Sequence, residues 1–465
     1  KYDYKILFLI IAFSFSIPVY SATNFNFYYQ YQDNIYKNSS HRWDVGSPDH
    51  YLELKFWSNN VRNVETFIKL GAGGGNPTSN AWLSEANIKY RITGKNDAKG
   101  MELIYYYNQD RLWQPDHIIN IVSNGYDIEG IRSDWWLPGS WSGTVFLGDQ
   151  KDNGADDFMF YTVRKELPKH NLKFNVSYGQ KRWGDAENQY NWFTGAFIQK
   201  KFGKNTFFSN EILQSGDPAQ TPAKNALAFK SELSWLRFSS DALGELGYKM
   251  QYWNFGKNYR NYLANGGYEN SGDECGYYNE IYYNLPQKAV TFTTRNTYRS
   301  YNDGVKKNNE IYTELYAEFI QGYSFKTSYN YYVKGYDYSS ILKDYYISDP
   351  ITHYPTYYIQ LERDVKDMWH KFFYRVQDIG TKYKKNELGI QNSINLTKKL
   401  TSYNEFNYQT KQYLKRDKFR LKTSLKYKIN DNSEFFAEYD TNQNYDGDDN
   451  APDNEKLFIK LAVWF

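Results

Sequence analysis

Hydrophobic and polar residues alternate at every second position along most of this chain. In 310–319 the odd positions hold apolar residues or Thr, and the even positions hold Glu or Tyr. In 418–429 apolar residues and Thr again occupy the odd positions, and Lys, Arg and Ser the even ones. A period of two is typical of a β-strand, because successive side chains point to opposite faces. No stretch after residue 21 shows a sustained helical period, so the pattern predicts an all-β protein.

The alternating segments are numerous and evenly sized. We expect about 24 strands, with 22 to 26 allowed, most of them roughly nine to twelve residues long, enough for a tilted strand to cross a bilayer. Short links such as 58–60, 286–288 and 430–432 alternate along the chain with long ones, among them 33–48, 71–81, 109–125, 255–275, 335–355 and 442–455. Tight periplasmic turns and long outer loops are typical of outer-membrane barrels.

The alternation fits two architectures. In a soluble antiparallel sheet, one face packs on a core and the other meets water. In a membrane barrel, the apolar face meets lipid and the polar face lines the lumen. The loop lengths favour a transmembrane, antiparallel, up-and-down β-barrel over a secreted soluble β-protein, and the N-terminal and C-terminal segments bear on the same choice.

The N-terminal segment has the pattern of a secretory signal peptide. Lys1 and Lys5 precede an apolar run over 6–17, which Pro18 ends, and small or tolerated residues follow. This run is shorter than a membrane-spanning helix requires. We therefore expect residues 1–21 to be a signal peptide and residues 22–465 to form one transmembrane barrel.

The final segment carries a more specific feature. Residues 456–465 have an apolar residue at every odd position and finish on an aromatic side chain; these positions are Leu457, Ile459, Leu461, Val463 and Phe465. In this the chain resembles bacterial outer-membrane β-barrel proteins, whose last strand ends in such an aromatic residue. The resemblance implies a location in the bacterial outer membrane, contact with lipopolysaccharide, and Phe465 as the signal that the barrel-assembly machinery recognises. It indicates a porin-like superfamily and no particular family.

Composition narrows the classes further. The chain has 13 Trp, 48 Tyr and 30 Phe, yet its mean hydropathy is −0.80, too polar for a bundle of membrane helices. Its single cysteine, Cys275, excludes an internal disulfide framework. With 56 basic and 53 acidic residues, it lacks the basic excess of a nucleic-acid-binding protein. Tyr and Trp suit membrane interfaces, where a ring can keep one edge wet.

The polar positions of the predicted strands would line the lumen with charges of both signs. These candidate lumenal residues are Arg295, Arg299, Glu310, Glu314, Glu318, Lys326, Arg420, Lys422, Lys426, Lys428, Glu434 and Glu438. Pairing about the 430–432 turn would place Lys428 opposite Glu434, and Lys422 opposite Asp440. Such pairs brace a barrel wall or create a transverse field that orients polar solutes, and both effects can coexist. A mixed lining argues against strong ion selectivity, which needs rings of one sign.

Lumenal aromatics and loops complete the expected channel. Tyr312, Tyr316, Trp369 and Phe373 fall in the polar registers and could stack on the faces of sugars, although aromatics are abundant enough to point inward by chance. A barrel this wide needs a constriction. We expect at least one of the loops 109–125, 255–275 and 335–355 to fold into the mouth or lumen.

Other chemistry is not indicated. None of the six histidines lies in a diagnostic catalytic signature, so we expect no enzymatic activity, and we assign no catalytic, metal-binding or cofactor-binding residue. The sequence therefore predicts a porin-like outer-membrane channel for passive diffusion of small hydrophilic solutes, with saccharides as one candidate class. A non-conducting scaffold, an adhesin or a polymer-export barrel is the alternative, and the sequence does not give the oligomeric state.

Overall fold

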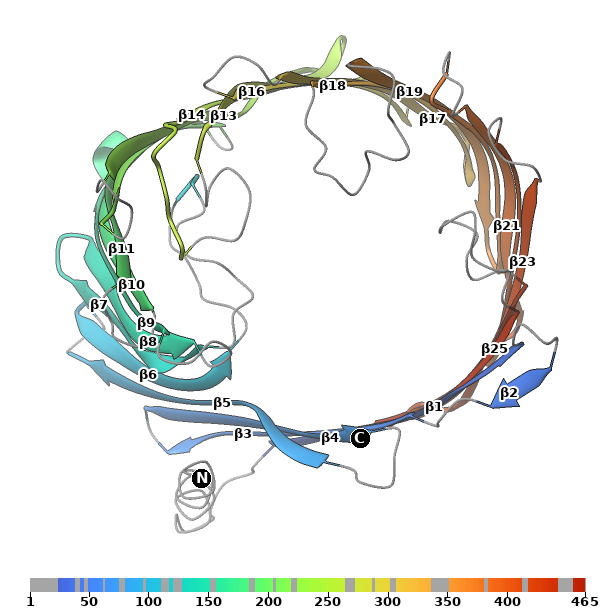
Figure 1. Cartoon of the computed structure of the whole chain (residues 1–465), viewed down its shortest axis with the longest axis horizontal. Coiled ribbons are helices and arrows are strands. Elements are labelled where there is room, and N and C mark those ends of the chain that lie inside the picture. Colours follow the sequence, from blue (N-terminus) through green and yellow to red (C-terminus); the bar gives the residue numbers. More distant parts are fainter. Residues whose placement is uncertain are drawn as a thin grey trace.

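The computed structural model of the chain is a closed ring of antiparallel strands (Figure 1). The structure describes residues 24–37, 42–45, 49–61, 63–74, 80–94, 98–109, 117–119, 128–150, 156–183, 189–203, 206–218, 224–263, 272–286, 289–301, 307–335, 351–379, 384–411, 417–441 and 455–464. The predicted signal peptide 1–21 and the predicted assembly signal Phe465 therefore lie outside the described residues. No helix among the described residues is long and apolar enough to cross a membrane.

The strands follow one another around the ring in chain order. They are β1 (Asn24–Lys37), β2 (Trp43–Val45), β3 (Asp49–Val61), β4 (Val64–Gly74), β5 (Asn80–Thr93), β6 (Gly100–Gln109), β7 (Ile128–Leu137), β8 (Trp141–Gln150), β9 (Asp156–Leu167), β10 (Leu172–Trp183), β11 (Gln189–Phe202), β12 (Thr206–Asp217), β13 (Lys224–Ser240), β14 (Gly244–Phe255), β15 (Glu274–Asn284), β16 (Ala289–Tyr301), β17 (Lys307–Ile320), β18 (Tyr323–Gly335), β19 (Ile351–Val365), β20 (Met368–Gln377), β21 (Lys385–Thr397), β22 (Leu400–Lys411), β23 (Lys418–Asn430), β24 (Ser433–Asp440) and β25 (Lys456–Trp464).

The first and last strands close the barrel. β1 pairs with β25 from Tyr28 opposite Trp464 to Tyr36 opposite Lys456, and it pairs with β3 on its other side. β2 pairs only with the end of β1, so 24 strands form the wall, as the alternation predicts. Closure satisfies the backbone of every strand, which a sheet in a bilayer requires. Strands extend further than expected at some loops: β4 continues to Gly74, where the sequence indicates a loop from residue 71.

Short turns join the strands at one end of the barrel. β17 and β18, for example, are linked by residues 321–322 alone, and Gly322 has a φ of 80°. A Cβ there would lie 2.3 Å from the carbonyl oxygen of Asp364, so this turn requires glycine. At the opposite end the strands are further apart in sequence, as between β6 and β7 and between β14 and β15. The predicted difference in length between the connections at the two ends is confirmed.

The outward face is apolar and exposed. Ile212, Leu421 and Leu425 are 46%, 42% and 46% exposed, and equivalent positions repeat around the wall. Some asparagines share this face, where an unpaired amide would be costly. Asn404 bonds Asn392 at 3.1 Å, and the Tyr248 hydroxyl donates to Asn279 at 2.9 Å. These outward asparagines are therefore tolerated because a neighbouring strand supplies a partner.

Large rings pack flat against glycines of neighbouring strands on the wall. Phe193 lies opposite Gly179, and Trp253 opposite Gly276, and in each pair an added Cβ would lie within 2.5 Å of the ring. The same arrangement joins Phe373 and Gly389. Each glycine therefore leaves the room that the neighbouring ring occupies against the sheet.

Candidate functional site in the barrel lumen

The lumenal face is identified by a segment that lies inside the ring. Residues 117–119 lie within the circle of strands in Figure 1 and contact Glu211 of β12. Residues directly opposite each other on paired strands share a face. From Glu211, successive partners run through Lys230, Trp253 and Gly276 to Arg299 of β16. Continuing this registry around the ring assigns every strand an inward and an outward set.

One side of the lumen, from β6 to β15, is filled by an apolar cluster. Most residues of the cluster belong to neighbouring strands of the wall. The others belong to two described segments inside the barrel, 117–119 and 256–263. We call these the inner segments. The cluster comprises Ile104, Tyr106, Ile119, Phe146, Phe158, Phe160, Phe193, Leu213, Ala228, Trp253, Phe255, Tyr259 and Leu263. Ile119 and Tyr259 are fully buried, so the inner segments are packed against the wall.

A buried carboxylate fixes the first inner segment. Glu211 is 1% exposed and accepts the backbone N–H groups of Ile118 and Ile119, both at 2.8 Å. The ring of His117 contacts the same carboxylate at 2.5 Å through Nδ1, and its Nε2 lies 3.2 Å from the amide of Asn175. A carboxylate that receives several hydrogen bonds is a strong anchor in a site from which water is excluded. Because the histidine is equally buried, this arrangement fixes the segment and offers no access to a substrate.

The second inner segment is held by polar groups of β11 and β12. The backbone N–H of Arg260 donates to Ser215 at 3.0 Å, and Asn191 bonds both Arg260 and Tyr262 through its side chain. The Tyr262 hydroxyl donates to Asp217 at 3.3 Å. Burial, together with the Asp217 carboxylate, raises the pKa of this phenol above its ordinary value, so it remains a neutral donor.

The predicted constriction is confirmed for two of the three loops. The described parts of 109–125 and 255–275 fold into the lumen and pack there. Of 335–355, residues 336–350 lie outside the described residues, and Ile351 already belongs to β19. Neither His117 nor Glu211 was among the candidate residues. The sequence feature that could have indicated this site is Glu211, a carboxylate on the same strand face as Leu213 in a segment with few other charges.

The other side of the lumen, from β15 through β25 to β4, is polar. All twelve charged residues predicted to line the lumen lie on this inward face. Glu314 pairs with Lys326 at 2.6 Å, and Arg295 pairs with Glu280 at 3.0 Å. Glu310 accepts a hydrogen bond from Asn330, and the backbone N–H of Gly322 donates to Glu318.

The ion pairs near the C-terminus do not join the residues that lie directly opposite each other. The backbone register agrees, with Lys428 opposite Glu434 and Lys422 opposite Asp440. The side chains of Lys422 and Lys426 nevertheless reach diagonally across the strands, and that of Lys428 reaches into the turn. The observed pairs are Lys422 with Glu438 at 3.0 Å, Lys426 with Glu434 at 2.7 Å and Lys428 with Asp431 at 2.7 Å. Strand twist favours such diagonal contacts for long side chains.

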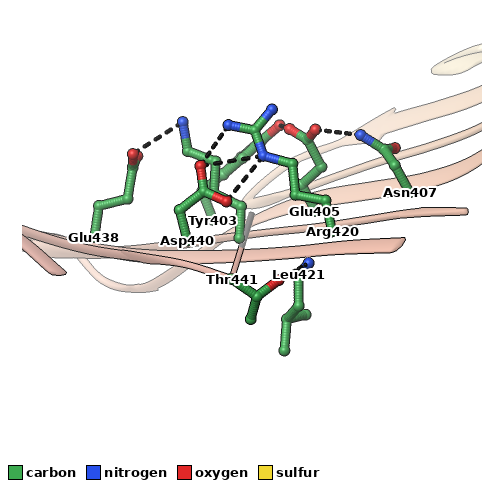
Figure 2. A network of polar contacts seen from close by, with 9 residues as sticks. Tyr403, Glu405, Asn407, Arg420, Leu421, Glu438, Asp440 and Thr441 are labelled. Carbon is green, nitrogen blue, oxygen red and sulfur yellow. Dashed lines mark hydrogen bonds and ion pairs between the residues drawn. The ribbon is translucent and has the colours of Figure 1, made fainter. Parts of the chain in front are cut away.

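Arg420 and Asp440 form the most enclosed pair of this group (Figure 2). The Nε atom of Arg420 lies 3.0 and 3.1 Å from the two carboxylate oxygens, and its Nη2 lies 2.5 Å from Oδ2. The side chains are 20% and 7% exposed, whereas Lys426 is 53% exposed. Fork-shaped pairing with a buried carboxylate is the strongest form of this interaction.

Replacing Arg420 should therefore cost more stability than replacing an exposed lumenal lysine. Arg420→Ala leaves the buried Asp440 carboxylate without its main partner, and we expect the free energy of unfolding to fall by about 2 kcal/mol. Lys426→Ala should cost less than about 1 kcal/mol, because its ion pair is exposed. Urea unfolding in detergent micelles measures both, and equal losses would contradict the ranking.

Tyrosines on the inward face are bonded to carboxylates two residues further along the same strand. The hydroxyl of Tyr51 donates to Glu53 at 2.7 Å and that of Tyr403 to Glu405 at 2.7 Å, and Tyr312 and Glu314 are paired in the same way. Residues i and i+2 share a face of a strand, which makes this contact possible. The Tyr-x-Glu spacing is visible in the sequence, but we did not predict the contact.

The remaining predicted lumenal aromatics also lie on the inward face. Trp369 donates from Nε1 to Glu362 at 2.8 Å, and Phe373 stacks on Tyr358 with ring centroids 5.9 Å apart. Phe373 is only 7% exposed, because it lies over Gly389, whereas Tyr316 faces the lumen opposite Lys326. Phe373 thus belongs to the wall rather than to a surface open to solutes.

Comparison with solved structures agrees with the architecture. The P pilus usher PapC translocation pore superposes with a TM-score of 0.52 over 94% of this chain and 99% of its own, at 10% identity. The chain therefore has the fold of a large, closed, membrane-type β-barrel. This barrel is also similar to the siderophore receptor PirA from Pseudomonas aeruginosa, with a TM-score of 0.50, 8% identity, and coverage of 96% and 81%. No protein-family model and no curated protein sequence matches the barrel.

Proposed function

We propose that the barrel is a passive channel for small hydrophilic solutes, with neutral saccharides as the favoured class. The route runs along the polar side of the lumen, opposite the inner segments. The observation that carries the proposal is the balanced lining of this side, where carboxylates are matched by nearby lysines, arginines or tyrosine hydroxyls. The fold alone supports transport or translocation in general terms, and the solute class is inferred from the lining.

A balanced lining suits neutral solutes for an electrostatic reason. Rings of a single charge sign select ions, whereas charges paired across strands cancel at a distance. At short range the same groups remain hydrogen-bond donors and acceptors. A saccharide offers hydroxyl groups to such a wall and carries no net charge that the wall would repel.

Conductance of the purified barrel tests the proposal directly. In a planar bilayer, we expect steady open-channel current with little preference between K⁺ and Cl⁻. In liposome swelling, we expect glucose and a neutral disaccharide to enter faster than glucuronate. The absence of current at all voltages would contradict the channel function and favour the scaffold, adhesin or polymer-export alternative.

Removing one member of an ion pair should unbalance the lining. Lys326→Met leaves Glu314 without its ammonium partner, so the lumen gains local negative charge. We expect the K⁺/Cl⁻ permeability ratio to rise roughly twofold, since a partly exposed charge contributes well under 1 kcal/mol. Reversal potentials in a KCl gradient give the ratio.

The matched control is Lys169→Met, which removes an exposed lysine from the 168–170 turn at the end of the barrel. It should leave the permeability ratio near the wild-type value. A shift of equal size in both variants would show that total charge, rather than the lumenal pair, sets selectivity.

A further inference from the structure

A hollow in the lumenal wall lies near the short-turn end of β3, β4 and β5. Its volume is ≈ 520 Å³, which falls within the range of about 300–1,000 Å³ typical of small-molecule sites. Its lining includes two aromatic rings, two carboxylates, an amide and an ammonium group, from Trp57, Phe67, Glu65, Glu85, Asn87 and Lys89.

The strand register brings these groups to one face. Trp57 lies opposite Phe67, Phe67 lies opposite Asn87, and Glu65 lies opposite Lys89. Trp57 is in register with Glu53, which is opposite the lumenal Tyr28. The side chains that define the hollow therefore point into the lumen and not toward lipid.

Trp57 is an open lumenal aromatic residue. It is 38% exposed, whereas Phe373 and Trp253, which also face inward, are 7% and 3% exposed and lie over glycines. An indole ring on a wetted wall presents apolar surface that a ligand can cover. The neighbouring Phe67 widens this apolar floor.

Glu65 and Lys89 are loosely held in the hollow. Glu65 lies 3.7 Å from Lys89, and their side chains are 64% and 39% exposed. Glu53, deeper in the same wall, is instead held by Lys55 at 2.6 Å and Lys69 at 2.9 Å, and it is 11% exposed. The carboxylate of Glu53 is thus bound by lysines of the wall, whereas the carboxylate of Glu65 remains accessible from the hollow.

We propose that this hollow is a binding subsite for a neutral saccharide. The sugar ring stacks its C–H face on Trp57, and its hydroxyls donate to the carboxylate of Glu65 and accept from Lys89. Two carboxylates against one ammonium disfavour an acidic sugar. The subsite deepens the proposed channel function, since solutes would meet it at one end of their route, but binding itself requires no conduction.

Isothermal titration calorimetry of the full-length barrel in detergent micelles tests the subsite, with maltose, glucosamine and glucuronate as probes. We expect saturable binding of maltose and the weakest binding for glucuronate. Trp57→Ala should weaken maltose binding at least tenfold, and Glu65→Gln should weaken it several-fold. Trp141→Ala is the matched control, because Trp141 is similarly exposed at 44% but faces outward.

Several outcomes would overturn the subsite: no saturable maltose binding, binding that survives Trp57→Ala, or binding of glucosamine alone, which would indicate an amine site. If Trp57→Ala fails to fold, Trp57→Phe keeps a ring and should retain binding, while Glu65→Gln still tests the polar contact. Maltose binding without bilayer current would leave the subsite standing and reject the channel. Bilayer current together with unchanged maltose binding in the variants would support the channel and reject the subsite.

Discussion

Glu211→Ala should release the first inner segment from the wall and open the lumen. The carboxylate accepts two backbone N–H groups and contacts His117, and all of these groups lose their partner in a site that water does not reach. We expect the free energy of unfolding to fall by about 3 kcal/mol, from several unsatisfied buried groups. We also expect single-channel conductance to rise, because the segment no longer narrows the passage.

A labelling experiment separates release of the segment from general loosening. Ile119 is fully buried, so Ile119→Cys in a Cys275→Ser background should react slowly with a hydrophilic maleimide. Adding Glu211→Ala should accelerate the reaction strongly. Glu434→Ala removes a lumenal carboxylate remote from the inner segments and should leave the rate unchanged. Slow labelling in the presence of Glu211→Ala would contradict the assigned anchor.

Gly276→Val should damage the wall where Trp253 lies across it. A Cβ at Gly276 would lie 2.2 Å from the carbonyl oxygen of Tyr298 and 2.5 Å from the indole ring. The ring is 3% exposed and donates to Glu274 at 3.0 Å, so it cannot move without losing both packing and a hydrogen bond. We expect a loss of about 3 kcal/mol or failure to fold.

Folded yield is measured by the heat-dependent shift of the barrel on gels, and stability by urea unfolding. Ala317→Val provides the comparison, because Ala317 lies on the outward face of β17 in register with Leu315, where added methyl groups meet lipid. Its stability should remain near that of the wild type. A folded, equally stable Gly276→Val protein would show that Trp253 has another position available.

The fold could be predicted because the residues of each strand alternate between an apolar and a polar face. In β23, and in β17 from Glu310 onward, mainly apolar positions alternate with charged or other polar ones, and the structure places the polar sets inward as expected. A slip of one residue would turn every charge toward lipid, so the pattern fixes the register strongly. Polar residues on the outward face were the exception, and cross-strand hydrogen bonds account for Asn404, Asn392 and Asn279.

The candidate site was only partly predictable. The lumenal charges follow from alternation, but the partner of each charge does not. Lys422 lies directly opposite Asp440 yet binds Glu438, because Arg420 occupies the Asp440 carboxylate. That choice depends on side-chain reach and competition among neighbours, which a one-dimensional pattern does not contain.

By itself, the sequence determined the all-β architecture, the division of each strand into two faces, and the presence of charges of both signs on one of them. These are local properties, because the alternation of apolar and polar residues can be read within each segment alone. The tertiary structure decided how the lumen is divided: an apolar side closed by the inner segments and a polar side lined by paired charges. His117 and Glu211 are 94 residues apart in the chain, and only closure of the ring brings the loop and the strand together.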